Sequence, residues 1–446
     1  MTSFPEGFYW GTATASFQIE GATREEGRGE SIWDRFAATP GMIKTGETGD
    51  PACDSYHRYL EDVALMCELG LNAYRLSTAW PRIIPDGTGP INQAGLDYYD
   101  RLVDALLNAS IVPFVTLYHW DLPQALQDRG GWASRATIDA YVRYVDTVVS
   151  RLGDRVKHWM THNEPACTAF LGHESGQHAP GLHDRALALQ VAHHLLVSHG
   201  AAVPVIRERC PGAQVGIALN LYPAYAATDT DADSAAARLA SARQNRWFLD
   251  PLAGRAYPQV AVDYYGDAMP LTQPEDFATI AAPLDFLGVN YYSRIVCHDP
   301  AGGDGHRVLH QRDAARVTER DWEVYPQGLL DLLTWLAREY AFPRLFITEN
   351  GAAYADVVTA DGSVHDAQRQ AYLSEHLAMA LQAIAAGVPL RGYFCWSLMD
   401  NFEWAFGTSS RFGLCYTDFA TQQRLVKDSG RWFGQVARAN ALTVKS

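Results

Sequence analysis

The segment from Val156 to Glu164 reads Val-Lys-His-Trp-Met-Thr-His-Asn-Glu, an apolar run, Val156–His162, that stops at an Asn-Glu pair. Seven further apolar runs of similar length are candidate strands: Phe8–Ala13, Ala73–Ser77, Ile111–Leu117, Val215–Leu219, Leu284–Val289, Leu345–Thr348 and Arg391–Cys395. Segments with helical spacing separate most of them. Near-continuous apolar strands that alternate with helices are typical of a parallel sheet covered on both faces.

Eight strand candidates of this kind predict a closed (β/α)₈ barrel. An open, doubly wound sheet is the alternative, but no G-x-G-x-x-G follows the first run. No linker or low-complexity stretch divides the 446 residues. We therefore expect one barrel domain, residues 1–446.

Two helices can be read from their spacing. Over 57–69, Leu60, Val63, Ala64 and Cys67 recur at i, i+3, i+4 and i+7, which predicts one buried face, and Gly70 follows as the terminator. The same spacing recurs after a Gly/Pro/Asn turn, at Tyr99, Leu102, Val103 and Leu106. Both segments fit the helices that a barrel needs between its strands.

Composition excludes several classes of protein. The net charge of −15 gives no support to binding of nucleic acid or of an anionic membrane. No apolar run approaches the ~20 residues of a membrane span, and the N-terminus lacks the pattern of a secretory signal. The seven scattered cysteines contain no C-x-x-C pair, which favours free thiols in a reducing cytoplasm. Nothing in the sequence indicates an oligomeric state.

Polar residues end several of the apolar runs. Glu164 and Glu349 follow the fourth and seventh runs, each beside an asparagine, and Asn220, Asn290 and Trp396 end three others. The carboxyl ends of barrel strands meet at one mouth, so the two glutamates are expected to face each other there. A pair of carboxylates in a pocket is the equipment for cleaving a glycosidic bond. The 12 tryptophans and 22 tyrosines agree with this, because sugar rings pack on aromatic planes.

Three motifs resemble those of family 1 glycoside hydrolases, the β-glucosidase family. Thr161–Pro165 (THNEP) resembles the acid/base motif, Ile347–Gly351 (ITENG) the nucleophile motif, and Phe8–Gly21 (FYWGTATASFQIEG) the N-terminal signature. The likeness extends from about Phe4 to Trp432. It implies a single (β/α)₈ barrel and retaining hydrolysis of β-glucosides and cello-oligosaccharides, with side activity on β-galactosides and β-fucosides.

The resemblance also implies roles for individual residues. Glu164 would be the acid/base and Glu349 the nucleophile, with Arg75, Asn290 and Tyr292 beside the nucleophile. A guanidinium and a phenol there would favour ionised Glu349, whereas Glu164 should hold its proton near neutral pH because of the charge of Glu349. The residues that resemble the family's sugar contacts are Gln18, His119, Trp120, Asn163, Trp396, Glu403 and Trp404.

On the leaving-group side, Ala166, Cys167 and Trp322 are the candidate residues. The family usually has a tryptophan directly after its Glu-Pro pair, and this chain has Ala166, which predicts a wider and less apolar subsite. Trp322 resembles the family's other aromatic residue on that side. Phe17 replaces a common tyrosine, with no chemical consequence expected.

The sequence disfavours three other interpretations. A 6-phospho-β-glycosidase would not keep Glu403, whose carboxylate repels a phosphate. A sugar-binding pseudoenzyme would not need both Glu164 and Glu349. His173, His178 and His183 recur every five residues, but without an H-E-x-x-H spacing we expect solvated or hydrogen-bonded histidines, no metal and no cofactor.

Overall fold

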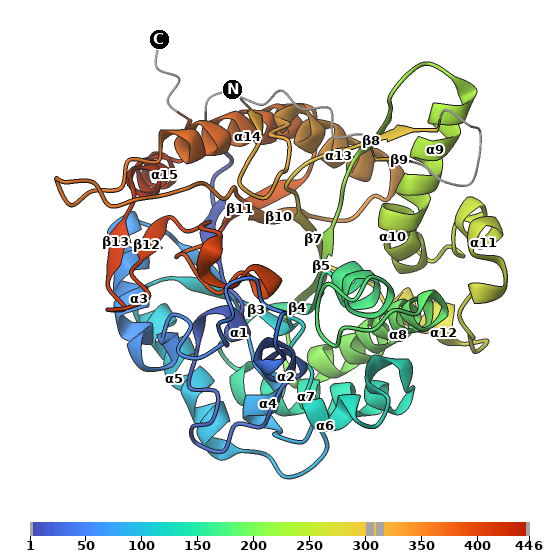
Figure 1. Ribbon diagram of the computed structural model, residues 1–446, viewed down its shortest axis with the longest axis horizontal. Helices are drawn as coiled ribbons and strands as arrows, with labels where there is room; N and C mark the ends of the chain where they lie inside the picture. Colours follow the sequence, from blue (N-terminus) through green and yellow to red (C-terminus); the bar gives the residue numbers. More distant parts are fainter. Residues whose placement is uncertain (1–2, 300–306, 309–315, 443–446) are drawn as a thin grey trace.

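The computed structural model describes residues 3–299, 307–308 and 316–442. Eight parallel strands close into a barrel in the order β1-β11-β10-β7-β5-β4-β3-β2, at the centre of Figure 1. Their bounds are β1 Tyr9–Ala13, β2 Ala73–Ser77, β3 Val112–Tyr118, β4 His158–Asn163, β5 Gln214–Asn220, β7 Phe286–Asn290, β10 Leu345–Asn350 and β11 Leu390–Trp396. All eight predicted strands are present, and the predicted barrel is confirmed.

Helices surround the barrel, as the ring in Figure 1 shows. The longer ones are α3 Ser55–Leu69, α5 Gln93–Asn108, α7 Ala136–Leu152, α8 Arg185–Arg209, α9 Asp231–Ser241, α13 Pro326–Glu339, α14 Ala367–Ala385 and α15 Asp428–Ala439. Shorter helices are α1 Ser16–Ile19, α2 Ile32–Ala38, α4 Trp80–Ile83, α6 Gln124–Gln127, α10 Trp247–Leu252, α11 Gln259–Tyr265 and α12 Asp276–Ile280. Short strands outside the barrel are β6 Ala224–Ala226, β8 Ile295–His298, β9 Arg307–Val308, β12 Cys415–Thr417 and β13 Arg424–Val426.

The predicted buried face of α3 is wrong at three of its four residues and right at Val63. Leu60 is 61% exposed, and Ala64 and Cys67 are exposed as well, whereas Val63 and Met66 are buried. Leu60, Ala64 and Cys67 form one apolar stripe along this helix, and Val63 and Met66 form a neighbouring one. The spacing alone does not decide which stripe faces the barrel. The end of α3 is as predicted, because Gly70 adopts a left-handed conformation with φ of 70°.

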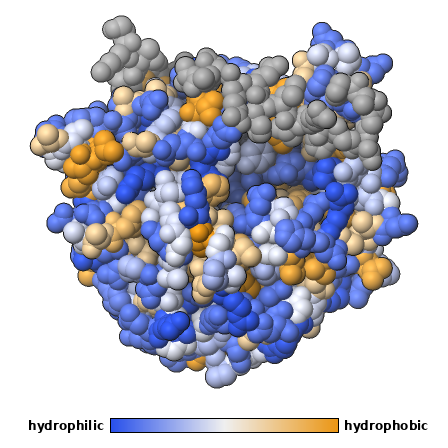
Figure 2. Space-filling view, in the orientation of Figure 1, coloured by the Kyte–Doolittle hydropathy of each residue, from blue (hydrophilic) through white to orange (hydrophobic). Residues whose placement is uncertain are grey.

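The predicted face of α5 is confirmed, since its four residues Tyr99, Leu102, Val103 and Leu106 are all buried. Helix α8 is the one described helix that is long and apolar enough, by length and composition, to cross a membrane. However, 78% of its apolar window is buried inside the protein, as in a core helix. The face in Figure 2 is largely polar, with small separated apolar areas.

Aromatic side chains pack against one another inside the barrel. Phe114 of β3 lies with its ring centroid 4.8 Å from that of Phe394 on β11 and 5.4 Å from that of Phe346 on β10. Gly11 of β1 makes room for them, because a Cβ there would lie 2.4 Å from the Phe394 ring. A packed apolar interior leaves the polar strand ends as the place for a site.

Candidate active site

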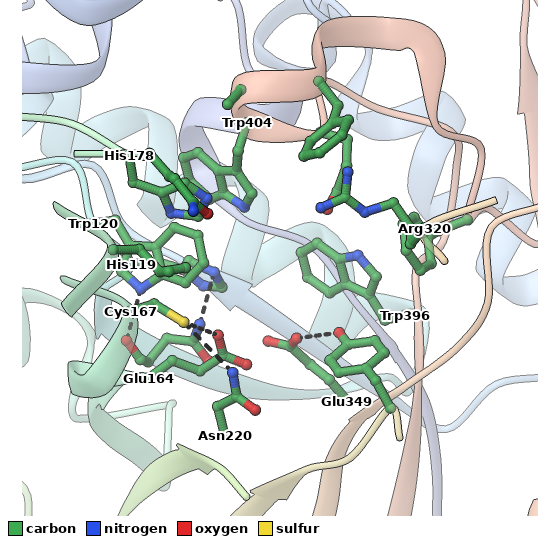
Figure 3. A pocket seen from close by; sticks show the side chains of 18 of the residues that line it. His119, Trp120, Glu164, Cys167, His178, Asn220, Arg320, Glu349, Trp396 and Trp404 are labelled. Carbon is green, nitrogen blue, oxygen red and sulfur yellow. Dashed lines mark hydrogen bonds between the residues drawn. The ribbon is translucent and has the colours of Figure 1, made fainter. Parts of the chain in front are cut away.

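Glu164 and Glu349 line the same cavity at the carboxyl ends of the strands, with a volume of about 560 Å³. They project toward it from opposite sides in Figure 3. The pairing of β4 with β5 shifts register between Met160 and Asn163, and that of β10 with β7 shifts between Ile347 and Glu349. Such irregularities redirect side chains at the end of a strand. The predicted meeting of the two glutamates is therefore present in the structure.

Glu349 is held by a cation and a phenol. Arg75 donates from Nη1 to Glu349 Oε1 at 2.5 Å, and the Tyr292 hydroxyl donates to Oε2 at 2.6 Å. Burial raises the pKa of Glu349, and Arg75 and Tyr292 oppose that rise. The predicted contacts that favour the ionised form are present, but burial, which sequence reasoning left out, is the larger effect.

Among the described residues, the hydrogen-bond partners of Glu164 are uncharged. Asn290 donates from Nδ2 to Glu164 Oε1 at 2.7 Å, and the Cys167 thiol donates to Oε2 at 3.1 Å. Burial and the nearby charge of Glu349 raise the pKa of Glu164 to about 8. The protonated form near neutral pH thus has two physical causes, of which the sequence indicated the second.

A continuous set of hydrogen bonds connects the two glutamates. Asn163 Oδ1 accepts from Arg75 Nη2 at 2.5 Å and from Asn290 Nδ2 at 3.0 Å. Arg75 also binds Glu349, and Asn290 also binds Glu164. Because each side chain is fixed by its neighbours, both carboxylates are held in place before any substrate binds.

Most of the predicted sugar contacts line this cavity. Gln18 donates from Nε2 to Glu403 Oε2 at 3.3 Å, while its own Oε1 is buried without a hydrogen-bond partner among the described residues. Asn163 Nδ2 and His119 Nε2 are 2.9 Å apart. The residues of the predicted sugar set that line the cavity are His119, Trp120, Asn163, Trp396, Glu403 and Trp404. Buried acceptors and aromatic planes of this kind fit a polyhydroxylated ring.

Three cavity residues have a backbone conformation that is rare for side chains larger than glycine. Trp120, Glu164 and Trp404 have φ values of 78°, 45° and 50°. Each such residue costs about 1–3 kcal/mol, and such conformations cluster at functional sites. The peptide bond between Trp396 and Ser397 is cis.

The predicted leaving-group residues lie where the main cavity meets a second one. Cys167 and Trp322 line both cavities, whereas Ala166 lines only the second, which has a volume of about 610 Å³. A π-helical segment, Cys167–Glu174, begins directly after Ala166 and adds Phe170 and Leu171 to the wall. The second cavity lies where the missing tryptophan of the resemblance predicts extra space.

Sequence reasoning missed several residues of the cavity wall. These are Gly41, Met42, Lys44, Leu171, Gln177, His178, Tyr222, Arg320, Ala405, Phe406 and Phe412. His178 was expected to be a solvated or hydrogen-bonded histidine, but burial and the charge of Arg320 lower its pKa to about 3, and its ring lies 5.3 Å from that of Trp120. Most of these residues lie on loops, where no periodic pattern marks them. Asn220 also lines the cavity, as its place at the end of a predicted strand indicates.

No group of three or more metal-ligating side chains occurs within residues 3–299, 307–308 and 316–442. The chemistry that the described site offers comes from two buried carboxylates with different partners. One has a cation and a phenol, and the other has a neutral amide and a thiol. Two such carboxylates beside a cavity wall of polar and aromatic side chains are characteristic of enzymes that cleave glycosidic bonds.

Comparison with known proteins specifies the family. The family model described as Glycosyl hydrolase family 1 matches residues 1–442, so the chain belongs to that family. It is similar to Beta-glucosidase A of Acetivibrio thermocellus, with 47% identity over 98% of this chain and 99% of that protein. It is also similar to 1,4-beta-D-glucan glucohydrolase of Thermotoga neapolitana, with 45% identity over 99% and 100% of the two chains.

Solved structures agree. The family 1 b-glucosidase from Thermotoga maritima superposes with a TM-score of 0.97, at 45% identity and over 99% of both chains. The same enzyme has been solved in complex with deoxynojirimycin, again with a TM-score of 0.97. These findings confirm the predicted family, the enzyme class and the fold, and the relatives carry the predicted name of β-glucosidase.

Proposed function

We propose that the protein is a retaining β-glucosidase in which Glu349 is the nucleophile and Glu164 the acid/base. The observation that carries this assignment is the unequal set of partners of the two glutamates. Arg75 and Tyr292 stabilise a negative charge on Glu349, whereas Glu164 has no cation in direct contact among the described residues. An ionised carboxylate can attack, and a protonated one can donate.

The reaction proceeds in two displacements. Glu349 attacks the anomeric carbon while the bond to the leaving oxygen breaks, and Glu164 gives its proton to that oxygen. The covalent glycosyl-enzyme is then attacked by water, whose proton passes to Glu164, and Glu349 leaves. Asn163, held by Arg75 and Asn290, supplies a hydrogen bond to the sugar 2-hydroxyl that strengthens in the transition state.

The relatives' names and the site support β-glucosides and cello-oligosaccharides as substrates, since one relative is named 1,4-beta-D-glucan glucohydrolase. Side activity on β-galactosides and β-fucosides is part of the proposal. The seven unpaired cysteines, six of them buried, support action in the cytoplasm.

Azide rescue tests the two roles. Glu349→Gly should abolish hydrolysis of a 4-nitrophenyl β-glucoside, and added azide should give the α-glycosyl azide. Glu164→Ala should still be glycosylated by a substrate with a good leaving group, and azide should then give the β-glycosyl azide. If Glu349→Gly gave the β-glycosyl azide and Glu164→Ala the α-glycosyl azide, the two roles would be reversed. An initial wild-type product of inverted configuration would exclude retention.

Two further substrates test the alternatives. Turnover of the 6-phosphorylated glucoside in preference to the neutral one would favour a 6-phospho-β-glycosidase. Binding of a glucoside without any turnover would favour a pseudoenzyme.

A further inference from the structure

A tight turn carries two side chains to the mouth of the cavity. Val317 and Glu323 pair as an isolated antiparallel bridge, and between them the Thr318 backbone N–H donates to the Trp322 carbonyl at 3.0 Å. The Arg320 backbone N–H donates to the Thr318 hydroxyl at 3.3 Å. The turn therefore fixes the backbone from which Arg320 and Trp322 project.

The same turn is attached to the catalytic strand end. The Glu319 backbone N–H donates to the carbonyl of Ala353, which follows β10 and Glu349 in the chain, at 3.0 Å. Arg320 is thus placed relative to the nucleophile by backbone contacts, which a side-chain substitution leaves intact.

The guanidinium of Arg320 is poorly satisfied. Its Nε and Nη1 are buried and have no hydrogen-bond partner in the described part of the chain, and no described carboxylate forms an ion pair with it. Its central carbon lies 3.2 Å from the ring centroid of Phe406 and 5.3 Å from that of Trp322. In Figure 3 it reaches into the cavity beside Trp396, on the side away from Trp120. A buried charged donor without a partner is costly, so an acceptor supplied by a ligand would be favourable.

The charged and titratable groups around Arg320 do not meet this need. Burial lowers the pKa of Arg320, the charge of Glu403 opposes that fall from a distance, and His178 is held neutral by burial and by Arg320 itself. Glu403 is assigned to the hydroxyls of the sugar ring. The leaving-group side, where Trp322 borders both cavities, remains the place where a further acceptor can approach Arg320.

We propose that Arg320 selects β-glucosides whose leaving group is an aromatic ring bearing a carboxylate. This inference rests on the proposed function and adds a substrate class to it. A planar guanidinium matches a carboxylate with two parallel hydrogen bonds, and Trp322 offers an aromatic face for the ring. Because the whole chain carries a net charge of −15, its overall field disfavours anions, and a preference for one has to come from a local cation.

A pair of substrates isolates the charge. The 4-(carboxymethyl)phenyl and 4-(carbamoylmethyl)phenyl β-glucosides differ by a carboxylate against a neutral amide, and the intervening methylene keeps the acidities of the two phenols similar. We expect the wild type to have the higher kcat/KM on the acid. Arg320→Met should reduce the acid-to-amide ratio about 10-fold, the size expected for one charge-assisted hydrogen bond.

Lys44→Met is the matched control. Lys44 lines the same cavity, is exposed, and lies with its Nζ 5.8 Å from the Phe406 ring centroid. Its removal takes away the same charge at the rim without the buried contact, so the ratio should change less than about 2-fold. Arg320→Lys, which keeps the charge, should retain part of the preference.

The outcomes separate the two proposals. An unchanged acid-to-amide ratio in Arg320→Met, or an equal loss on both substrates, would overturn the assignment of Arg320. Equal changes of the acid-to-amide ratio in Lys44→Met and Arg320→Met would mean that any positive charge at the cavity attracts the acid. That result would also overturn the assignment of Arg320. If Arg320→Met does not fold, inhibition of the wild type by 4-hydroxyphenylacetate and by its amide decides, with equal inhibition overturning the proposal. Failure of the wild type on every neutral aryl β-glucoside would contradict the proposed function instead.

Discussion

Tyr292→Phe removes one hydrogen bond from Glu349 and should move the acidic limb of the pH profile. The hydroxyl donates to Glu349 Oε2 at 2.6 Å, and burial together with Glu349 raises the pKa of the phenol, so it remains a donor at working pH. A hydrogen bond to a charged group contributes about 1.5–3 kcal/mol, and 1.36 kcal/mol corresponds to one pKa unit. The ionised nucleophile loses that stabilisation, so its pKa should rise by about 1–2 units.

The measurement is kcat/KM for 2,4-dinitrophenyl β-glucoside as a function of pH. This leaving group needs little help from an acid, so the acidic limb reports ionisation of the nucleophile within the coupled pair. A higher pKa means that a higher pH is needed for the ionised form, so the limb should move to higher pH. Tyr141→Phe is the control, because its buried hydroxyl donates to the Thr161 backbone carbonyl and contacts neither glutamate. An acidic limb that stays in place in Tyr292→Phe, or moves to lower pH, refutes the reasoning.

Three further predictions follow from the same site. Ala166→Trp should partly fill the second cavity and reduce kcat/KM for bulky aryl leaving groups more than for small alkyl ones, whereas a uniform change would place Ala166 outside the leaving-group subsite. Glu403→Ala should weaken discrimination between gluco- and galacto-configured substrates about 10-fold, and an unchanged ratio of kcat/KM values would contradict that role. Burial holds the proton of Glu164 up to a pKa of about 8 against an ordinary 4.5, so stability is lost as pH rises through that window. Glu164→Gln should therefore raise the urea midpoint more at pH 8.5 than at pH 5, and an equal increase at both would contradict the shift.

The barrel was predictable from sequence because each of its strands is a short, mostly apolar run that can be recognised without its neighbours. Strand β2 has the predicted bounds, Ala73–Ser77, and every residue in it is buried. Helix α3 shows the limit, because Leu60 and Met66 lie on neighbouring apolar stripes of the same helix and only packing decides which stripe is buried. Pro113, an apparent misfit in a strand, is the second residue of β3, near the strand start where prolines are tolerated.

The two glutamates and their neighbours were predictable for a related reason. A parallel barrel brings the carboxyl ends of its strands to one mouth, so a polar residue that directly follows an apolar run has a known destination. Glu164 directly follows β4, Glu349 is the last residue but one of β10, and Asn290 ends β7. The magnitude of their pKa shifts was not predictable, because it depends on burial by residues far apart in the chain.

Most of the remaining cavity wall comes from loops. In the proposed function, the strand ends and the loops contact different parts of the substrate. Arg320 and Phe406 come from segments without periodic patterning, yet they lie in contact at the mouth of the cavity. The strand ends supply the carboxylates and their hydrogen-bonded neighbours, which act on the sugar and its bond. In the proposed function, the loops supply the surfaces that meet the leaving group, which is the variable part of a β-glucoside. A sequence pattern set by strands therefore predicts the reaction, whereas the preferred leaving group depends on contacts such as that of Arg320 with Phe406, which only the folded chain brings together.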